Sequence, residues 1–156
     1  MRKLRVFVDT SVFGGCFDEE FERHSKQFFE EVRSGRFEIV VSQTVLDELE
    51  GAPARVREVF AEISENSVLV AIDSDIEDLR DAYIEAGVVG ASSLDDAEHI
   101  AVASAERVDL VVSWNFKHIV HFDKIKGYNA VNLLKGYQPI DIRNPVEVID
   151  HEEKDI

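Results

Sequence analysis

Short runs of β-branched and aromatic residues recur along this chain, and segments with helical periodicity separate them. The runs fall at residues 4–8, 37–41, 68–72, 109–113 and 140–142. Between them the pattern predicts helices at 18–33, 43–50, 53–65, 74–87, 123–135 and from an N-cap at Ser93 to Arg107. Strands that alternate with helices form a parallel sheet covered on both faces. The sequence therefore predicts an α/β fold.

The length predicts one domain. The chain has 156 residues and contains no repeat, linker or low-complexity segment. Residues 1–145 carry the predicted elements, and residues 146–156 are predicted to form an acidic C-terminal tail, either an edge element or loosely held. Residues 9–15, after the first strand, are predicted to form a polar, glycine-rich turn, and Ser74 with Glu77 has the spacing of a capping box.

The charge balance excludes several classes of protein. With 17 basic and 32 acidic residues the net charge is −15, whereas a general nucleic-acid or membrane-surface binder carries a basic face. The single cysteine, Cys16, excludes an internal disulfide and a multi-cysteine zinc site. No apolar run approaches the ~18 residues that span a bilayer, and the N-terminus enters a strand without a leader-like segment. We therefore expect a cytoplasmic protein without membrane association.

Four polar residues follow or flank the predicted strands at one edge of the sheet. In parallel sheets, sites form beyond the carboxyl ends of the strands, where the strand order reverses. Asp9 directly follows the first strand, and Asn115 follows the fourth. Glu48 lies on the helix after the second strand, and Asp96 lies in the first turn of the helix before the fourth. We expect these four side chains to gather at that edge.

Two of these assignments have a competing neighbour. Helical periodicity places both Glu48 and Glu50 at the border of the apolar arc, so the pattern alone does not choose between them. Asp95 and Asp96 both lie in a first helical turn, where the helix dipole stabilises negative charge. Capping the helix could therefore be the whole role of either residue. Asp9 is the strongest candidate, because a carboxylate directly after a buried strand needs a partner or a ligand.

A cluster of carboxylates suits a hard divalent cation. Carboxylates a few ångströms apart repel each other, and a cation keeps them ionised. Mg²⁺ is commonly held by one or two carboxylates together with waters and a phosphate, and Mn²⁺ accepts the same ligands. Such an ion also bridges an acidic pocket and an anionic substrate, which reconciles the net charge with a phosphate-containing substrate.

Four segments of the chain resemble the PIN-domain ribonucleases. They are Asp9-Thr10-Ser11 after the first strand, VLDEL at 45–49, DAEHIAVA at 96–103 and LVVSWNFKHI at 110–119. The resemblance runs from about residue 4 to residue 142, and the motifs occur in the family's order. Within the family, the chain is most similar to the VapC-like toxins of type II toxin–antitoxin systems.

The resemblance implies a three-layer α/β/α sandwich with strand order 3-2-1-4-5. It also implies Mg²⁺- or Mn²⁺-dependent hydrolysis of RNA phosphodiester bonds. It selects Glu48, which precedes a leucine, and Asp96, which precedes an alanine. Asp9, Glu48 and Asp96 then carry over as metal ligands or water-orienting carboxylates. A hydroxyl of Ser11 or Thr10 would support Asp9, and Asp95 stays a supporting candidate.

The chain departs from the family at Asn115, a catalytic position where many members have an aspartate. Asparagine keeps an oxygen ligand but removes a negative charge, so one-ion and two-ion mechanisms both stay open. Around it lies the only strongly basic stretch, residues 111–140, with four lysines and one acid. The residues predicted to contact single-stranded RNA are Trp114, Phe116, Lys117 and His118.

The resemblance to toxins implies partners: an RNA substrate, a cognate antitoxin that covers the acidic site, and a second copy in a homodimer. A PIN-like binding or scaffold protein that has lost turnover through Asn115 is the alternative. A receiver-type signalling domain, with Asp73 as phosphoacceptor, and an aspartate-nucleophile phosphatase rank last. The first needs adjacent acids after the first strand and the second an acid two positions after Asp9, where this chain has Thr10 and Ser11.

Overall fold

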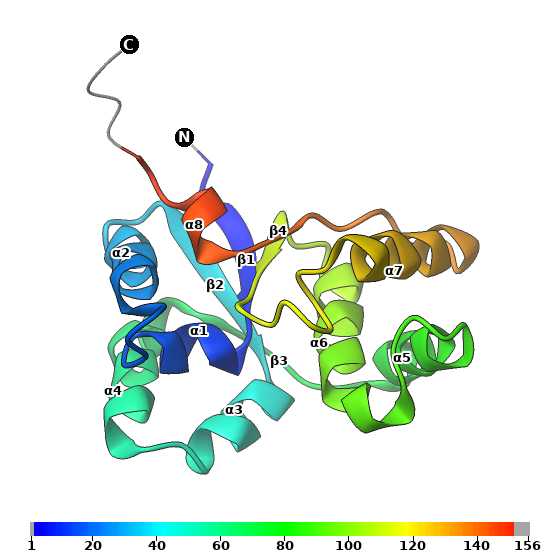
Figure 1. Cartoon of the computed structure of the whole chain (residues 1–156), viewed down its shortest axis with the longest axis horizontal. Helices are drawn as coiled ribbons and strands as arrows, with labels where there is room; N and C mark the ends of the chain where they lie inside the picture. The colour runs from blue at the N-terminus through cyan, green and yellow to red at the C-terminus, as the bar shows by residue number, and fades with distance from the viewer. Residues whose placement is uncertain (1, 152–156) are drawn as a thin grey trace.

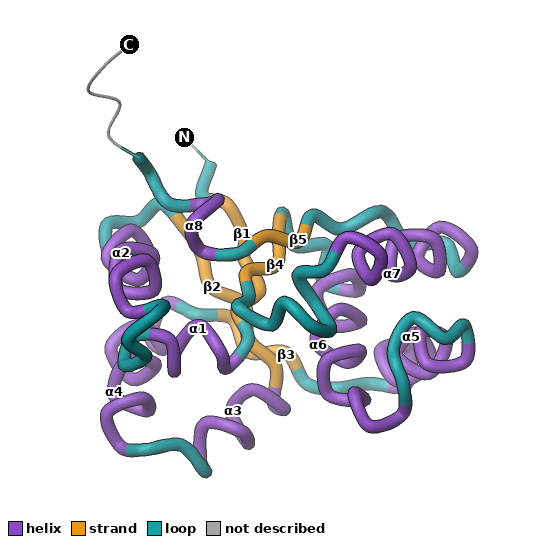
Figure 2. The backbone as a smooth tube through the Cα atoms, viewed as in Figure 1, coloured by secondary structure: helices purple, strands orange, loops and turns teal. Residues whose placement is uncertain are grey.

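Five parallel strands form one sheet in the computed structural model of the protein, which describes residues 2–151. The strand order is β3-β2-β1-β4-β5 (Figure 2), and the register of every neighbouring pair is parallel. The strands are β1 (Leu4–Val8), β2 (Phe37–Ser42), β3 (Val68–Val70), β4 (Leu110–Val112) and β5 (Ile142–Arg143). The predicted α/β fold and strand order are confirmed.

Helices cover both faces of the sheet. In Figure 1, α1, α2 and α4 lie on one side of the sheet and α5, α6 and α7 on the other, which makes three layers. Their bounds are α1 (Thr10–Gly15), α2 (Glu22–Arg33), α3 (Gln43–Glu50), α4 (Ala54–Ile63), α5 (Ser74–Glu85), α6 (Leu94–Ala105), α7 (Phe122–Leu134) and α8 (Pro145–Val148), with 3₁₀ turns η1 (Ser64–Asn66) and η2 (Ala91–Ser93). Among residues 2–151, no helix is both long and apolar enough to cross a membrane.

The adjacent strands β1 and β4, on either side of the reversal in strand order, are deeply buried. Val6, Phe7 and Val8 of β1 and Val111 and Val112 of β4 have no exposed surface, as expected for strands covered on both faces. From β1 the chain passes to β2 on one side, and it returns later to β4 on the other. The strand order therefore reverses between β1 and β4, and their carboxyl ends open onto the same edge of the sheet.

Residues 10–15 form the short helix α1, so the predicted glycine-rich turn over 9–15 is wrong. The helix forms because its apolar residues have a place in the core: Val12 and Phe13 are completely buried. Tertiary burial outweighs the low helix propensity of Gly14 and Gly15 here. The following helix, α2, begins at Glu22 rather than at residue 18.

The N-caps also differ from the sequence pattern. Asp73, not Ser74, caps α5, because its side chain accepts a hydrogen bond from the Ile76 amide at 2.9 Å. Ser93 occupies the N-cap position of α6, but its side chain makes no capping hydrogen bond. With its carboxylate serving as a cap, Asp73 has a structural role that also weakens the receiver-domain alternative.

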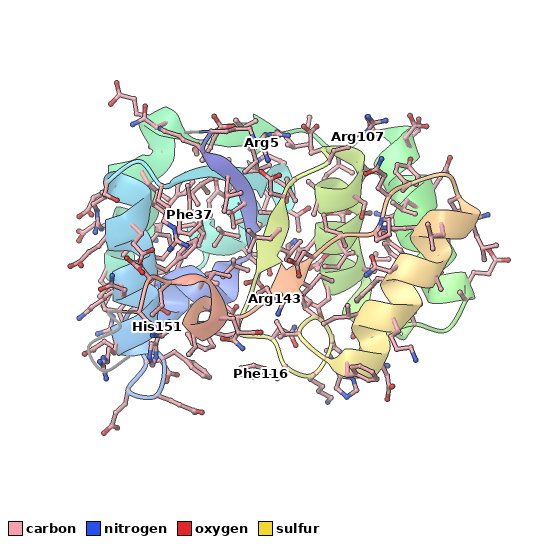
Figure 3. All side chains as sticks on the ribbon, turned by 90° about the horizontal axis from the view of Figure 1, so that it is seen from above. Arg5, Phe37, Arg107, Phe116, Arg143 and His151 are labelled. Carbon is pink, nitrogen blue, oxygen red and sulfur yellow. The ribbon has the colours of Figure 1, made fainter. Side chains whose placement is uncertain are left out.

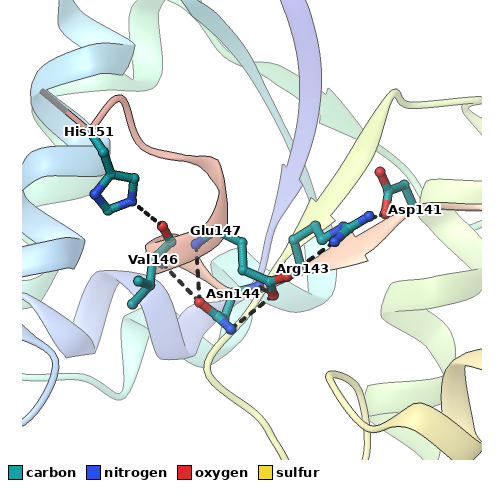
Figure 4. A network of polar contacts seen from close by, with 6 residues as sticks. All are labelled: Asp141, Arg143, Asn144, Val146, Glu147 and His151. Atoms are coloured by element: carbon teal, nitrogen blue, oxygen red, sulfur yellow. Dashed lines mark hydrogen bonds and ion pairs between the residues drawn. The ribbon is translucent and has the colours of Figure 1, made fainter. Parts of the chain in front are cut away.

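The chain after β5 packs against the domain. Asn144 forms a capping box with Glu147 at the start of α8, and Arg143 binds Asp141 at 2.8 Å and Glu147 at 3.1 Å (Figure 4). The Asp150 amide donates to both carboxylate oxygens of buried Glu31 on α2, at 3.0 and 3.1 Å. Residues 146–151 of the predicted tail are thus held in place, and 152–156 lie outside the described residues. The domain boundary at residue 145 stays a prediction.

Candidate functional site

Asp9 lies at the end of β1 and joins it to the end of β4. It is only 4% exposed, and the hydroxyls of Ser11 and Ser113 donate to its two oxygens at 2.6 and 2.9 Å. The same hydroxyls accept the backbone amides of Trp114 at 3.0 Å and Asn115 at 2.9 Å. Burial raises the pKa of Asp9, against the opposing effect of His99 and of these hydrogen bonds. The carboxylate is therefore buried, oriented and poorly solvated.

Glu48, on α3, meets the end of β1 from the neighbouring helix. Its Oε1 atom accepts hydrogen bonds from Thr10 Oγ1 at 3.1 Å and from His99 Nε2 at 3.2 Å. Burial raises its pKa, but the bonds from His99 and Thr10 outweigh this effect and hold the pKa below its ordinary value. The structure thus brings Glu48 to the cluster, and Thr10 binds Glu48 instead of Asp9.

His99, on α6, lies among the three acids and was not among the predicted site residues. It is 2% exposed, and its ring packs on Phe7 with 5.5 Å between centroids. Burial lowers its pKa, but the bond to Glu48 and the charges of Asp9, Glu48 and Asp96 outweigh this and raise the pKa. One signal was available: His99 follows Asp96 by three residues on one helix, which places both on the same face.

Asp96 lies half-buried in the first turn of α6, while its neighbour Asp95 is exposed. Burial raises the pKa of Asp96, while His99, His118 and a hydrogen bond from Asn115 lower it. The Oδ1 atom of Asn115 accepts the backbone amides of Lys117 at 3.2 Å and His118 at 2.9 Å. With Oδ1 occupied by these two amides, the amide nitrogen of Asn115 is the atom that can donate to Asp96.

The predicted RNA contacts divide into buried and exposed groups. Trp114 is only 7% exposed, stacks on Phe21 with 4.2 Å between centroids and donates its Nε1–H to Ser25 at 2.7 Å. This corrects the prediction for Trp114, because its buried ring has almost no exposed surface for a base. Phe116 is 46% exposed on the loop after β4 (Figure 3), and Lys117 beside it is also exposed. His118 is half-buried and near enough to Asp96 for its charge to lower the pKa of that carboxyl.

The acids fit a divalent cation by their chemistry. No three His, Cys, Asp or Glu side chains of residues 2–151 converge closely enough to hold an ion by themselves. Mg²⁺, however, keeps several waters and takes one or two carboxylates plus a phosphate, rather than a closed protein cage. Oε2 of Glu48 makes no hydrogen bond to the described residues, and each Asp9 oxygen accepts only one side-chain bond. Lone pairs of these carboxylates thus remain free to bind an ion, and substrate and water would supply the other ligands of that ion.

The comparisons with known proteins agree with this geometry. A family model described as the PIN domain matches residues 5–117, which include all four predicted site residues. The chain belongs to the PIN-domain family. No curated protein matches this chain.

Solved structures share the PIN fold at low sequence identity. A toxin–antitoxin complex from Klebsiella pneumoniae is 19% identical, with a TM-score of 0.55 over 72% of this chain and 88% of that one. VapC20 of Mycobacterium tuberculosis, a sarcin–ricin loop cleaving toxin, is 17% identical, with a TM-score of 0.52 over 72% and 92%. VapBC2 of Rickettsia felis, bound to a fragment of its promoter DNA, is 14% identical, with a TM-score of 0.56 over 90% and 98%. These similarities show a common fold.

Proposed function

We propose that this PIN domain is a metal-dependent endoribonuclease that hydrolyses phosphodiester bonds in RNA. The observation that carries the proposal is the gathering of Asp9, Glu48 and Asp96, from three separate segments, around one buried histidine. Burial raises the pKa of both Asp9 and Asp96, so their ionised forms need a cation. The neighbour described as a sarcin–ricin loop cleaving toxin supports RNA as the substrate.

Each acid in this site has its own support. One or two of the carboxylates of Asp9, Glu48 and Asp96 would hold Mg²⁺ or Mn²⁺ together with water and the phosphate. The ion, when bound, would neutralise charge on the phosphate and lower the pKa of a bound water. Ser11 and Ser113 orient Asp9 by donating to its two oxygens. Because Asn115 offers Asp96 a donor instead of a further carboxylate, we propose a site for one ion.

The loop after β4 and the first turns of α7 supply a contact surface for single-stranded RNA. Phe116 is 46% exposed and Phe122 is 73% exposed, and Lys117 lies next to Phe116 in the chain. Lys126 Nζ lies 5.4 Å from the centroid of the Phe122 ring. Exposed aromatic rings stack on bases, and lysines attract the phosphate backbone. We propose that Phe116 takes the stacking role first predicted for Trp114.

The test is cleavage of single-stranded RNA with Mg²⁺, Mn²⁺ or EDTA. Asp9→Asn and Asp96→Asn each remove a carboxylate charge, and each is expected to lower the rate on the order of 10²-fold. Asp95→Asn is the matched control, because Asp95 is the exposed neighbour of Asp96 in the same helical turn. Equal cleavage by all four proteins, or full activity in EDTA, would reject the proposal.

We further propose that the chain is the toxin of a toxin–antitoxin pair, acting in the cytoplasm as a homodimer. Two of the structural neighbours come from toxin–antitoxin systems. Expression of the wild type is expected to arrest growth, and Asp9→Asn is expected to abolish the arrest. Co-expression of the adjacent reading frame should restore growth. Arrest that persists with Asp9→Asn would contradict the toxin proposal.

The placement of Asn115 favours one alternative, a PIN-like protein that binds a partner without turnover. Its amide is a donor at a position where many PIN domains have an aspartate. Such a protein would release no RNA product with any divalent ion and would still bind its partner. The cleavage assay therefore separates the two functions.

A further inference from the structure

We propose that His99 is the positioning residue for Glu48, holding one carboxylate oxygen so that the other faces the ion and the substrate. The role of Glu48 itself rests on the proposed nuclease function. The hydrogen bond that His99 makes does not depend on that function, so the two can be tested apart.

Two donors converge on one oxygen of Glu48. His99 Nε2 lies 3.2 Å from Oε1, and Thr10 Oγ1 lies 3.1 Å from the same atom. Because a carboxylate only accepts hydrogen bonds, the imidazole must carry its proton on Nε2. The Oε2 atom has no such bond among the described residues. A planar carboxylate held at one oxygen from two sides has its second oxygen aimed in a fixed direction.

His99 is rigid, whereas Glu48 is not rigid by itself. The His99 side chain is 3% exposed and its ring packs on Phe7. The Glu48 side chain is 37% exposed, and an unrestrained glutamate samples several rotamers. His99 also shares helix α6 with Asp96, one turn away. The imidazole therefore fixes where Glu48 stands relative to Asp96.

Packing alone does not explain a histidine here. Its Nδ1 atom is buried and has no hydrogen-bond partner within residues 2–151, a condition that an apolar side chain of similar volume would avoid. Nor is the pair needed to join α3 to α6. Thr44 on α3 already donates to Glu98 on α6, and Arg80 binds the same carboxylate at 2.9 Å. The polar contact that remains for the His99 ring is Glu48.

Binding of Mn²⁺, measured by calorimetry on the full chain, tests the proposal. His99→Leu removes the donor, and loss of such a supporting contact typically weakens metal affinity about 10- to 100-fold. His99→Gln, which restores an N–H donor, is expected to recover most of the affinity. Thr10→Val, which removes the second donor without touching the core, should weaken binding less. Thr44→Val is the matched control across the same helix pair and should bind as wild type.

A double-mutant cycle shows whether His99 acts through Glu48. In a Glu48→Ala background, His99→Leu is expected to cause no further loss of Mn²⁺ affinity. In the metal-free protein, the shifts in Tm caused by His99→Leu and Glu48→Gln should be non-additive, because the two side chains share one bond. A folded His99→Leu protein that binds Mn²⁺ as wild type would overturn the proposal. So would His99→Gln behaving like His99→Leu, or additive Tm shifts.

The outcomes separate this inference from the nuclease proposal. Wild type that cleaves no RNA but shows the expected Mn²⁺ and Tm results would reject the nuclease and leave the role of His99 standing. Cleavage that needs Asp9 and Asp96 but is unchanged in His99→Leu would reject the role of His99 alone.

Discussion

At the scale of single residues, side-chain donors hold Asp9 and Glu48 in place. Ser11 and Ser113 bind Asp9, while Thr10 and His99 bind Glu48. Charge-assisted hydrogen bonds of this kind favour the ionised carboxylate, and burial disfavours it. The balance leaves the pKa of Asp9 raised and that of Glu48 lowered. The site is thus ordered in advance and still electrostatically unsatisfied, which suits a cation.

Asn115→Asp tests how charge is balanced at Asp96. An aspartate can accept the amides of Lys117 and His118 as Asn115 does, but it turns a donor toward Asp96 into a second negative charge. We expect a loss of stability on the order of 1 kcal/mol in EDTA and a larger rise in Tm with Mn²⁺ than wild type shows. Thermal unfolding with and without Mn²⁺ measures both. Identical Mn²⁺ responses would contradict this account of Asn115.

Asp109, far from the site, predicts a pH dependence of stability. It accepts the Arg5 amide at 2.7 Å and the Arg2 guanidinium at 3.0 Å. Burial raises its pKa, but these bonds outweigh it and hold the pKa below the ordinary value of 3.8. A lowered folded-state pKa adds stability above pH 3.8, and this stability is lost as the pH falls through the folded-state pKa.

Asp109→Asn isolates this effect. We expect it to lower the free energy of unfolding on the order of 1 kcal/mol at pH 7. The difference from wild type should shrink below pH 3.8 as Asp109 becomes protonated in both states of the wild type. Urea unfolding at several pH values measures it. A difference that stays constant down to pH 2 would show that charge is not the cause.

At the scale of elements, the short helix α1 organises the site. It starts directly after Asp9 and so presents Thr10 to Glu48 and Ser11 to Asp9. Its other end packs closely, because a Cβ atom at Gly15 would lie 2.5 Å from Ser25 Oγ and 2.7 Å from Trp114 Nε1. Glycine is needed here for close approach of α1 to α2 and to the chain after β4.

Gly15→Ala is therefore expected to disturb the packing of α1 against Ser25 and Trp114. The added methyl group should separate Trp114 from Ser25, and overpacking of this kind costs about 1–3 kcal/mol. The chain has one tryptophan, so the emission spectrum reports Trp114 alone and should shift to longer wavelength. Gly14→Ala is the control, because a Cβ atom there would meet nothing within 4 Å. Equal spectra for the two variants would contradict the close-packing argument.

At the scale of the whole molecule, the reversal of strand order brings distant segments to one edge. Parallel strands end at the same edge, so β1 delivers Asp9 and β4 delivers Ser113 and Asn115 to one place. Helix α6, which precedes β4, brings Asp96, and helix α3, which follows β2, brings Glu48. The far end of α7 is different, because Leu133 and Leu134 are 64% and 84% exposed there. These two adjacent exposed leucines are the place where we expect the contact of the proposed homodimer.

Leu134→Glu tests whether this end of α7 forms the proposed homodimer. Wild type is expected to elute with twice the 17.7 kDa mass of one chain, and the variant as a monomer, because a buried unpaired charge is strongly unfavourable at an apolar contact. Size-exclusion chromatography with light scattering measures the masses. A monomeric wild type would reject the dimer. A variant that is still dimeric would show that the dimer contact lies on another surface.

The sequence alone determined the α/β fold, because alternating strand and helix periodicity is a local property of the chain. It also placed Asp9, Asn115 and the Asp95–Asp96 pair near the ends of elements. The family resemblance supplied the strand order and selected Glu48 over Glu50 and Asp96 over Asp95. Helix α1 was not predicted, because burial of Val12 and Phe13 outweighs the low helix propensity of its glycines.

Only the tertiary structure decided the contacts of the site. Trp114 is packed against Phe21 and not open to RNA, and Asn115 is a donor and not an open oxygen. His99 and Ser113 enter the site from positions that look like ordinary core residues in the sequence. Periodicity tells which side of an element is buried, but a hydrogen bond across two elements depends on how the whole chain folds around it.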